Sequence, residues 1–161
     1  MGGLTPIAFD IETSGLDQSA VVTVAGFGHE LGYWLFLNTG GRSVETADVE
    51  GPLGEYVTAP VSLTVVGDER ELLEAVSAFV GGHIDGETHY LTAYNGETWN
   101  GGFDLPFLRT RLNYHDLGWP FEDIPYIEAM EVFESRFNTT ENALVEVYGE
   151  LLGDGLGDVD P

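Results

Sequence analysis

Residues 8–16 read Ala8-Phe9-Asp10-Ile11-Glu12-Thr13-Ser14-Gly15-Leu16, an apolar run that carries two carboxylates and ends in a Ser-Gly turn. The pattern of residues 7–12 predicts a β-strand. Side chains two positions apart on a strand point to the same face, so Asp10 and Glu12 are expected side by side. Adjacent carboxylates repel each other, and a bound cation or a shared proton usually relieves that repulsion. Such hard oxygen ligands suit Mg²⁺ or Mn²⁺.

An Asp-x-Glu triplet also occurs often on a solvated strand face. In an acidic chain this plain interpretation carries most of the weight unless a second motif accompanies the first.

The composition indicates one folded α/β domain. The chain has 161 residues, 43% of them hydrophobic, which is enough for a full core. It has no Cys, so disulfides, thiol catalysis and Cys-ligated zinc are excluded. No apolar run is long enough to span a bilayer, and the N-terminus lacks the features of a signal peptide. We therefore expect a cytoplasmic protein without a membrane partner.

The charge is extreme, with 5 basic residues, all Arg, against 28 acidic ones and a net charge of −23. Such self-repulsion destabilises a compact domain in dilute salt, but the Debye length falls to about 3 Å at 1 M salt. We infer a high-salt cytosol, such as that of a halophilic archaeon. An acidic chain is ordinarily a poor partner for nucleic acid, but in molar salt the repulsion of phosphates is screened, and stacking, hydrogen bonds and bridging metals can carry binding.

The order of expected elements predicts an antiparallel meander of three strands, followed by helices alternating with further strands. The expected strands are residues 7–12, 21–28, 33–37, 61–66, 91–94 and 124–130, with a hairpin turn at 28–32. Expected helices are one capped by Asp68 and stopped by Gly81 and Gly82, one starting near Asp104, and one over residues 141–152 with Leu144, Val145, Tyr148 and Leu151 inward. Residues 38–60 are expected to be a surface insertion in a domain of residues 1–152, and 153–161 an acidic Gly-Asp tail, or the start of a further C-terminal part.

A second motif joins the first. The run Phe9–Leu16, followed by Tyr94-Asn95-Gly96 and by Phe103-Asp104-Leu105-Pro106-Phe107-Leu108, resembles the first two motifs of the DEDD (DnaQ-like) 3′–5′ exonucleases, which have a ribonuclease H-like fold. The resemblance covers roughly residues 6–152, and it is strongest to the proofreading domains of family B DNA polymerases and to stand-alone archaeal relatives.

The resemblance implies a catalytic site with two Mg²⁺ or Mn²⁺ ions, which hydrolyses phosphodiester bonds at the 3′ end of single-stranded DNA or RNA. Asp10 would bridge both ions, Glu12 would bind the ion of the attacking water, and Asp104 would bind the ion of the leaving group. Substrate contacts are implied for a second set: Thr13, Leu16, Asn95, Phe103 and Phe107. For Leu16, Phe103 and Phe107, packing in the core is an equally good interpretation.

The fourth carboxylate of the family, which follows a Tyr or His on a later helix, is not found. His115-Asp116 comes too early, and Asp154, Asp158 and Asp160 have no such partner. The chain is then a fragment or a degenerate relative, and the loss of general-base help is typically worth about 10²–10⁴-fold in rate. We expect an exonuclease that is weak or inactive as this chain. Two alternatives stay open: a non-catalytic ribonuclease H-like module that binds nucleic acid or protein, and a plain acidic structural domain.

Overall fold

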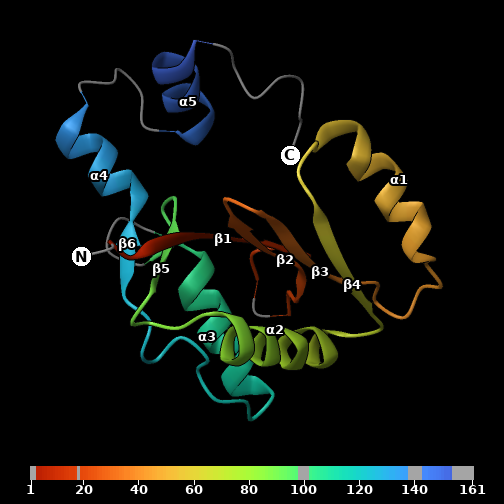
Figure 1. Ribbon diagram of the computed structural model, residues 1–161. Helices are drawn as coiled ribbons and strands as arrows, with labels where there is room; N and C mark the ends of the chain where they lie inside the picture. Colours follow the sequence, from red (N-terminus) through yellow and green to blue (C-terminus); the bar gives the residue numbers. More distant parts are fainter. Residues whose placement is uncertain (1–2, 18, 98–101, 138–142, 154–161) are drawn as a thin grey trace.

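The computed structural model describes residues 3–17, 19–97, 102–137 and 143–153, and within them a six-stranded mixed sheet with five helices (Figure 1). The sheet has the order β4-β3-β2-β1-β5-β6. Its strands are β1 (Thr5–Thr13), β2 (Val22–His29), β3 (Gly32–Asn38), β4 (Val61–Val66), β5 (His89–Ala93) and β6 (Tyr126–Glu128).

The predicted meander is confirmed, because β1 pairs antiparallel with β2, and β2 with β3. The remaining pairs are parallel: β1 with β5, β5 with β6, and β3 with β4. The chain is therefore of the predicted α/β class, and this sheet is compatible with a ribonuclease H-like fold. Among the described residues, no helix is both long and apolar enough to cross a membrane.

The helices depart from the sequence expectation in four places. The five helices are α1 (Thr46–Tyr56), α2 (Glu69–His83), α3 (Asp104–Tyr114), α4 (Ala129–Arg136) and α5 (Leu144–Leu152). The insertion 38–60 contains α1, which sequence reasoning missed because this helix buries none of its residues and includes Pro52. The strand expected over 124–130 ends at Glu128, where the Glu128 side chain accepts a hydrogen bond from the Met130 N–H and caps α4.

Gly81 and Gly82 do not stop α2, which was expected of them. Both lie inside the helix, which continues to His83. Two interior glycines cost about 1 kcal/mol each relative to alanine, and the buried stripe just before them, which includes Phe79 and Val80, holds the helix in place. The expected N-cap is confirmed, because the Asp68 side chain accepts a hydrogen bond from the Glu71 N–H.

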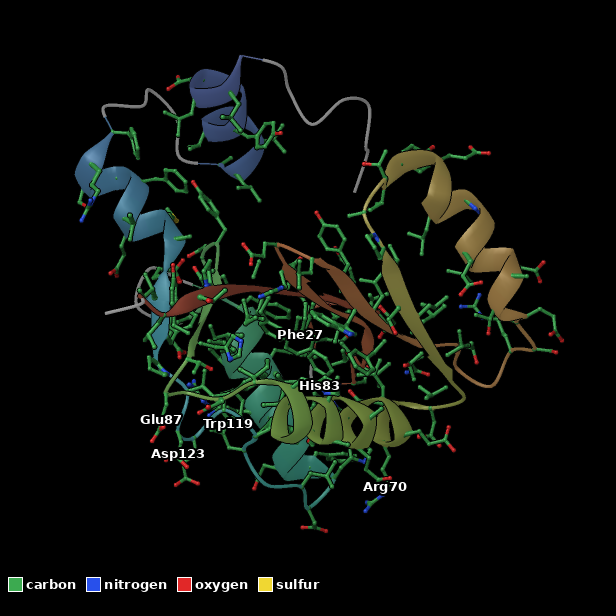
Figure 2. The ribbon with its side chains drawn as sticks, viewed as in Figure 1. Phe27, Arg70, His83, Glu87, Trp119 and Asp123 are labelled. Carbon is green, nitrogen blue, oxygen red and sulfur yellow. The ribbon has the colours of Figure 1, made fainter. Side chains whose placement is uncertain are left out.

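The core lies between one face of the sheet and helices α2 and α3 (Figure 2). The alternation predicted for β1 is observed, since Ile7, Phe9 and Ile11 are buried while the residues between them are exposed. Phe27 on β2 is central to this layer, with its ring 5.1 Å from that of Phe9 and 4.9 Å from that of Phe79. Helices α2 and α3 leave the opposite face of β1 free to carry polar groups.

Helices α4 and α5 lie on that opposite side of the sheet (Figure 1). The inward face predicted for α5 is wrong: Leu144, Val145 and Leu151 are 46%, 59% and 37% exposed, and Val147 is buried instead. The apolar residues of this helix share one broad side, with Glu146, Gly149 and Glu150 on the other, and the buried residue, Val147, lies at the margin of the apolar side. The start of the expected helix, residues 141–142, lies outside the described residues.

One buried carboxylate ties the sheet to both core helices. Glu69, at the start of α2, accepts hydrogen bonds from the Val22 N–H at 2.8 Å, from the Arg111 guanidinium at 2.8 Å and from the His115 ring at 2.8 Å. Burial alone would raise the pKa of Glu69, but the hydrogen bonds from Arg111, Val22 and His115 outweigh it and lower the pKa below 4.5. This cluster fixes β2 against α2 and α3.

We predict that Arg111→Met lowers the free energy of unfolding by about 3–5 kcal/mol at pH 7, because it leaves the Glu69 charge buried without its main partner. A depressed pKa stabilises the fold above pH 4.5 and loses that effect as pH falls through the folded-state pKa, so the gap to the wild type should close in acid. Denaturant titration at pH 7 and at pH 3.5, in molar KCl, measures both.

The control is Glu74→Gln, which breaks an ion pair with Arg70 whose two side chains are about half exposed, and which leaves the Arg70 hydrogen bond to the His115 carbonyl in place. Its expected cost is below about 1 kcal/mol. Equal losses for the two variants would contradict the anchoring role of Glu69.

Candidate active site

Strand β1 carries Asp10 and Glu12 on its solvent face, opposite Phe9 and Ile11. The pairing with β2 is regular through Glu12, which lies opposite Val24, and then shifts, so that Thr13 lies opposite Val22. An irregularity of this kind bends a strand and re-aims its side chains, and such features recur beside functional sites. The two carboxylates therefore stand at the point where β1 turns away from the sheet.

Asp104 reaches the same place from another element. Strands β1 and β5 are parallel, with Ala8 opposite Thr92, so their carboxyl ends lie at one edge of the sheet. The chain leaves β5 at this edge and returns as α3, whose first residue is Asp104. The Asp104 carboxyl group forms a hydrogen bond with Asp10. The structure thus brings together the three residues that the sequence singled out as catalytic and metal-binding.

Their mutual repulsion is evident in the proton affinities. Burial, the charge of Asp10, the hydrogen bond to Asp10 and the charges of Glu12 and Glu128 together raise the pKa of Asp104 to about 7. Partial desolvation of its carboxyl group and the charge of Glu12 also raise the pKa of Asp10, although the residue as a whole is exposed. Raised pKa values on both partners favour a proton shared by the Asp10–Asp104 pair, one of the two ways to relieve like charges at close range.

A bound cation is the other way to relieve the repulsion between these carboxylates. The donor atoms are carboxylate oxygens, which fit Mg²⁺ or Mn²⁺ by their chemistry, and neutralising the repulsion would favour such an ion. Among the residues that the structure describes, however, no group of three or more His, Asp or Glu side chains is arranged so that it could hold a metal ion. A proton shared by Asp10 and Asp104 would compete with a cation for the same oxygens, so cation binding at this pair requires release of that proton.

Glu128 is the functional residue that sequence reasoning missed. Placed at the end of β6, it accepts backbone hydrogen bonds from Asn95 at 2.6 Å, Gly96 at 3.0 Å and Glu97 at 3.3 Å. It also accepts one from the Tyr126 hydroxyl at 2.7 Å. Because β6 is parallel to β5, its last residue had to fall at the edge that carries Asp10, and this register argument could have identified it.

Asn95 has an unusual backbone and a buried side-chain atom. Its φ of 57° lies in the left-handed region, which non-glycine residues rarely adopt. Its Oδ1 atom is buried and has no hydrogen-bond partner in the described part of the chain. A buried acceptor of this kind is costly, so the Asn95 side chain is placed to accept from a donor or a cation that the described part of the chain does not provide.

The remaining predicted substrate contacts separate into exposed and packed residues. Leu16 is 83% exposed, so core packing is excluded for it. Phe103 and Phe107 stack on each other with ring centroids 4.8 Å apart, and Phe107 also packs against the core. Thr13 donates its hydroxyl to the Gly15 carbonyl at 2.8 Å and so holds the turn after the two carboxylates.

Other charged residues are removed from the candidate set by their contacts. Arg109 binds Glu97 through two hydrogen bonds, and Arg111 binds Glu69. His115 also binds Glu69, so it belongs to the core cluster. The tail residues Asp154, Asp158 and Asp160 lie outside the described residues.

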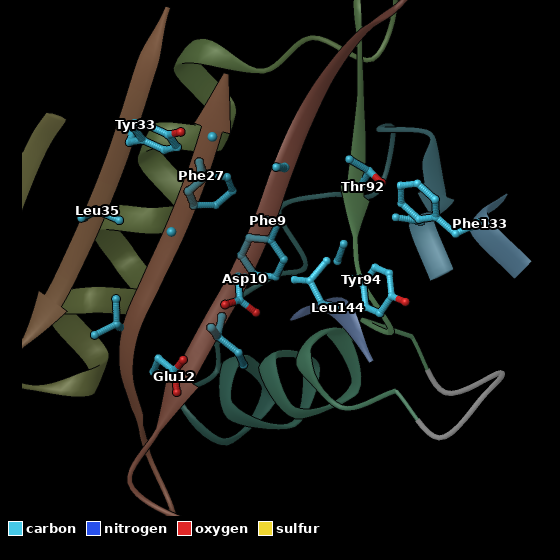
Figure 3. Close-up of a pocket in the computed structure, with 17 residues that line it drawn as sticks. Phe9, Asp10, Glu12, Phe27, Tyr33, Leu35, Thr92, Tyr94, Phe133 and Leu144 are labelled. Carbon is cyan, nitrogen blue, oxygen red and sulfur yellow. The ribbon is translucent and has the colours of Figure 1, made fainter. Parts of the chain in front are cut away.

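Beside the carboxylates lies a hollow of about 530 Å³ on the sheet face (Figure 3). Gly26 and Gly28 on β2 are among the residues that line it. Asp10 and Glu12 project into it from β1, between Tyr33 on β3 and Tyr94 beyond β5 (Figure 3). Phe133 from α4 and Leu144 from α5 complete the lining. The volume lies in the usual range for small-ligand pockets.

We predict that one carboxyl group of the pair titrates near pH 7 and that Asp10→Asn moves the pKa of Asp104 down toward its ordinary value of 3.8. The substitution removes a charge that disfavours the Asp104 anion and supplies an amide that can donate to it. Carbon-13 NMR of the aspartate carboxyl groups at one fixed KCl concentration measures this shift. Asp48→Asn, on the exposed surface of α1, is the control and should leave the titration unchanged. A wild-type Asp104 that titrates near 4 would contradict the prediction.

The chain matches no protein-family model and no curated protein at a significant level.

Proposed function

We propose that this protein is a divalent-metal-dependent 3′–5′ exonuclease acting on single-stranded nucleic-acid ends, of the DEDD type that its motifs resemble. The observation that supports this most is the convergence of Asp10, Glu12 and Asp104 at one edge of the sheet. Three carboxylates held close together, two of them with raised pKa values, are unfavourable for stability alone and are typical of a site that does chemistry.

Asp10, Glu12 and Asp104 would hold the Mg²⁺ or Mn²⁺ ions, which when bound activate water and stabilise the leaving oxygen of the phosphodiester. The chain's own contribution is to aim these carboxylates. Strand β1 fixes Asp10 and Glu12 on one face, and α3 fixes Asp104 at its first turn. The positive end of the α3 dipole also favours an anion here, such as the phosphate of a substrate.

The surroundings of the carboxylates suit a single strand better than a duplex. The exposed Leu16 side chain and the Phe103–Phe107 pair offer apolar surfaces for a terminal base, while Tyr33 and Tyr94 line the hollow. Stacking of bases on aromatic rings is worth about 1–3 kcal/mol per base and tolerates any sequence. Stacking also works in molar salt, where a chain of net charge −23 no longer repels phosphates strongly.

A non-catalytic module that binds nucleic acid is the second candidate. It is favoured by the state of Glu128, the fourth acidic residue near Asp104, whose oxygens already accept hydrogen bonds from the Asn95–Glu97 backbone. The described residues then offer only three carboxylates to the cations. On this account the chain would bind a single strand and turn it over slowly or not at all.

We predict that the chain, with Mn²⁺ in molar KCl, shortens a 5′-labelled single-stranded oligonucleotide from its 3′ end, and that Asp10→Asn slows this at least about 100-fold. Removing a preorganised charge from the reacting centre typically costs about 10²–10³ in rate. Denaturing gel electrophoresis of time points on DNA and RNA oligonucleotides measures it.

The control for this assay is Asp48→Asn, which makes the same change of charge on α1, beside the far strand β4. It should cleave like the wild type. Binding of the oligonucleotide without any 3′ shortening would overturn the exonuclease proposal in favour of the binding module. Cleavage that persists in Asp10→Asn would point to a contaminating nuclease.

We further predict that Mn²⁺ binds about tenfold more tightly at pH 8 than at pH 6. The pKa of Asp104 near 7 means that the ion must displace a proton at the lower pH and not at the higher one. Titration calorimetry at both pH values, in at least two buffers of different ionisation enthalpy, gives the affinity and the number of protons released. A pH-independent affinity, or one retained in Asp10→Asn, would place the ion elsewhere.

A further inference from the structure

We propose that Glu128 is a positioning residue for Asp104: it anchors the backbone of Asn95–Glu97 and, through Gly96, fixes the first turn of α3. The proposal rests on the proposed function only for its effect on turnover. The positioning itself is a statement about hydrogen bonds and can be tested without any activity.

The Glu128 carboxylate anchors the turn formed by Asn95–Glu97. Oε1 of Glu128 accepts the Asn95 N–H, and Oε2 accepts those of Gly96 and Glu97. Three successive backbone donors converging on one carboxylate form a concave anion-binding turn. Hydrogen bonds to a charged acceptor are about twice as strong as neutral ones, so Glu128 is the dominant contact of this turn.

Gly96 connects this turn to the start of α3, where Asp104 lies. Gly96 donates its N–H to Glu128 and accepts, through its carbonyl, the N–H of Leu105 at 2.8 Å. Leu105 is the neighbour of Asp104 in the first turn of α3 and is itself buried. A single residue, Gly96, thus connects the Glu128 carboxylate to the backbone next to Asp104.

The turn depends on this anchor because its own conformation is unfavourable. Asn95 has a φ of 57°, and a side chain on Gly96 would overlap Ala93. A side chain on Gly102 would likewise overlap the backbone of Glu97, so this segment is packed directly against the end of the loop before α3. Strained backbone persists only where surrounding contacts determine it, and here those contacts come from Glu128.

The alternative role, as a fourth cation ligand, conflicts with the same contacts. A carboxylate offers about four lone-pair positions, and Glu128 already accepts from three loop amides, from the Tyr126 hydroxyl and from the Met130 N–H. To bind an ion directly it would have to release several of these donors. Its place is therefore behind the site, where it holds the segment that presents Asp104.

The test is amide hydrogen exchange by NMR, without metal, on Glu128→Gln and on the control Glu131→Gln. Glu131 lies three residues away on the exposed side of α4 and loses the same charge. We expect exchange at least tenfold faster in Glu128→Gln for the amides of Asn95, Gly96, Glu97 and Leu105. The amides shared by β2 and β3 should stay within about twofold in both variants, which excludes global destabilisation as the cause.

The Leu105 amide decides the proposal. If it exchanges as in the wild type while the loop amides are released, Glu128 holds the loop alone and the proposal is wrong. If Glu131→Gln produces the same pattern, the effect is one of charge and the proposal is equally wrong. Should Glu128→Gln fail to fold, Tyr126→Phe removes one donor to the same carboxylate and should accelerate exchange at the same four amides by about two- to fivefold, and unchanged exchange there would overturn the proposal.

Turnover provides the second readout. For a wild type that cleaves, Glu128→Gln should lower kcat by about 10–100-fold, with KM for the oligonucleotide within about threefold, as for other residues that orient a ligand-bearing group. A change in KM alone would contradict positioning. A wild type that does not cleave would instead refute the proposed function, and the exchange experiment would still decide the role of Glu128.

Discussion

The candidate site depends on one geometric constraint, the parallel alignment of β1 and β5. Parallel neighbours deliver their carboxyl ends to the same edge of a sheet, and here one strand ends in Asp10 and Glu12 while the other leads to Asp104. Strand β6 adds a third parallel member and places Glu128 at the same edge. No local interaction would bring four acids together against their repulsion, so the energy for doing so must come from the packing of the sheet on α2 and α3.

The sequence was sufficient for the elements with a clear period. The alternation in β1 predicted the exposed pair Asp10 and Glu12, and the cap predicted at Asp68 is where α2 begins. Sequence reasoning failed for helices that bury little: α1 buries none of its residues and includes Pro52, and α5 buries only Val147, at the margin of its broad apolar side. The pairing of Asp10 with Asp104 could be inferred only from motif order, because no local pattern encodes the distance between residues 94 positions apart.

The role of Glu128 could not be predicted from the sequence for a related reason. In a chain with 28 acidic residues, one more glutamate at the end of a short strand carries no signal of its own. What distinguishes it is the set of backbone donors that meet it, and these come from residues more than 30 positions away. The role of Glu69 could not be predicted either, because it depends on hydrogen bonds from Val22, Arg111 and His115, which are far away in the sequence.

Glu69, the Asp10–Asp104 pair and the surface acids differ in how their charge is balanced. They are therefore expected to respond differently to pH and salt. Glu69 has a cationic partner and buried donors, so its pKa is lowered and its charge stabilises the fold at neutral pH. Desolvation and the repulsion among Asp10, Glu12 and Asp104 instead raise the pKa values of Asp10 and Asp104. The acids on the surface are balanced only by the salt of the solvent, and molar KCl acts mainly on these because screening weakens with burial. Salt can therefore stabilise the domain as a whole without removing the repulsion between Asp10 and Asp104, which leaves that repulsion available to drive the exchange of a proton for a cation.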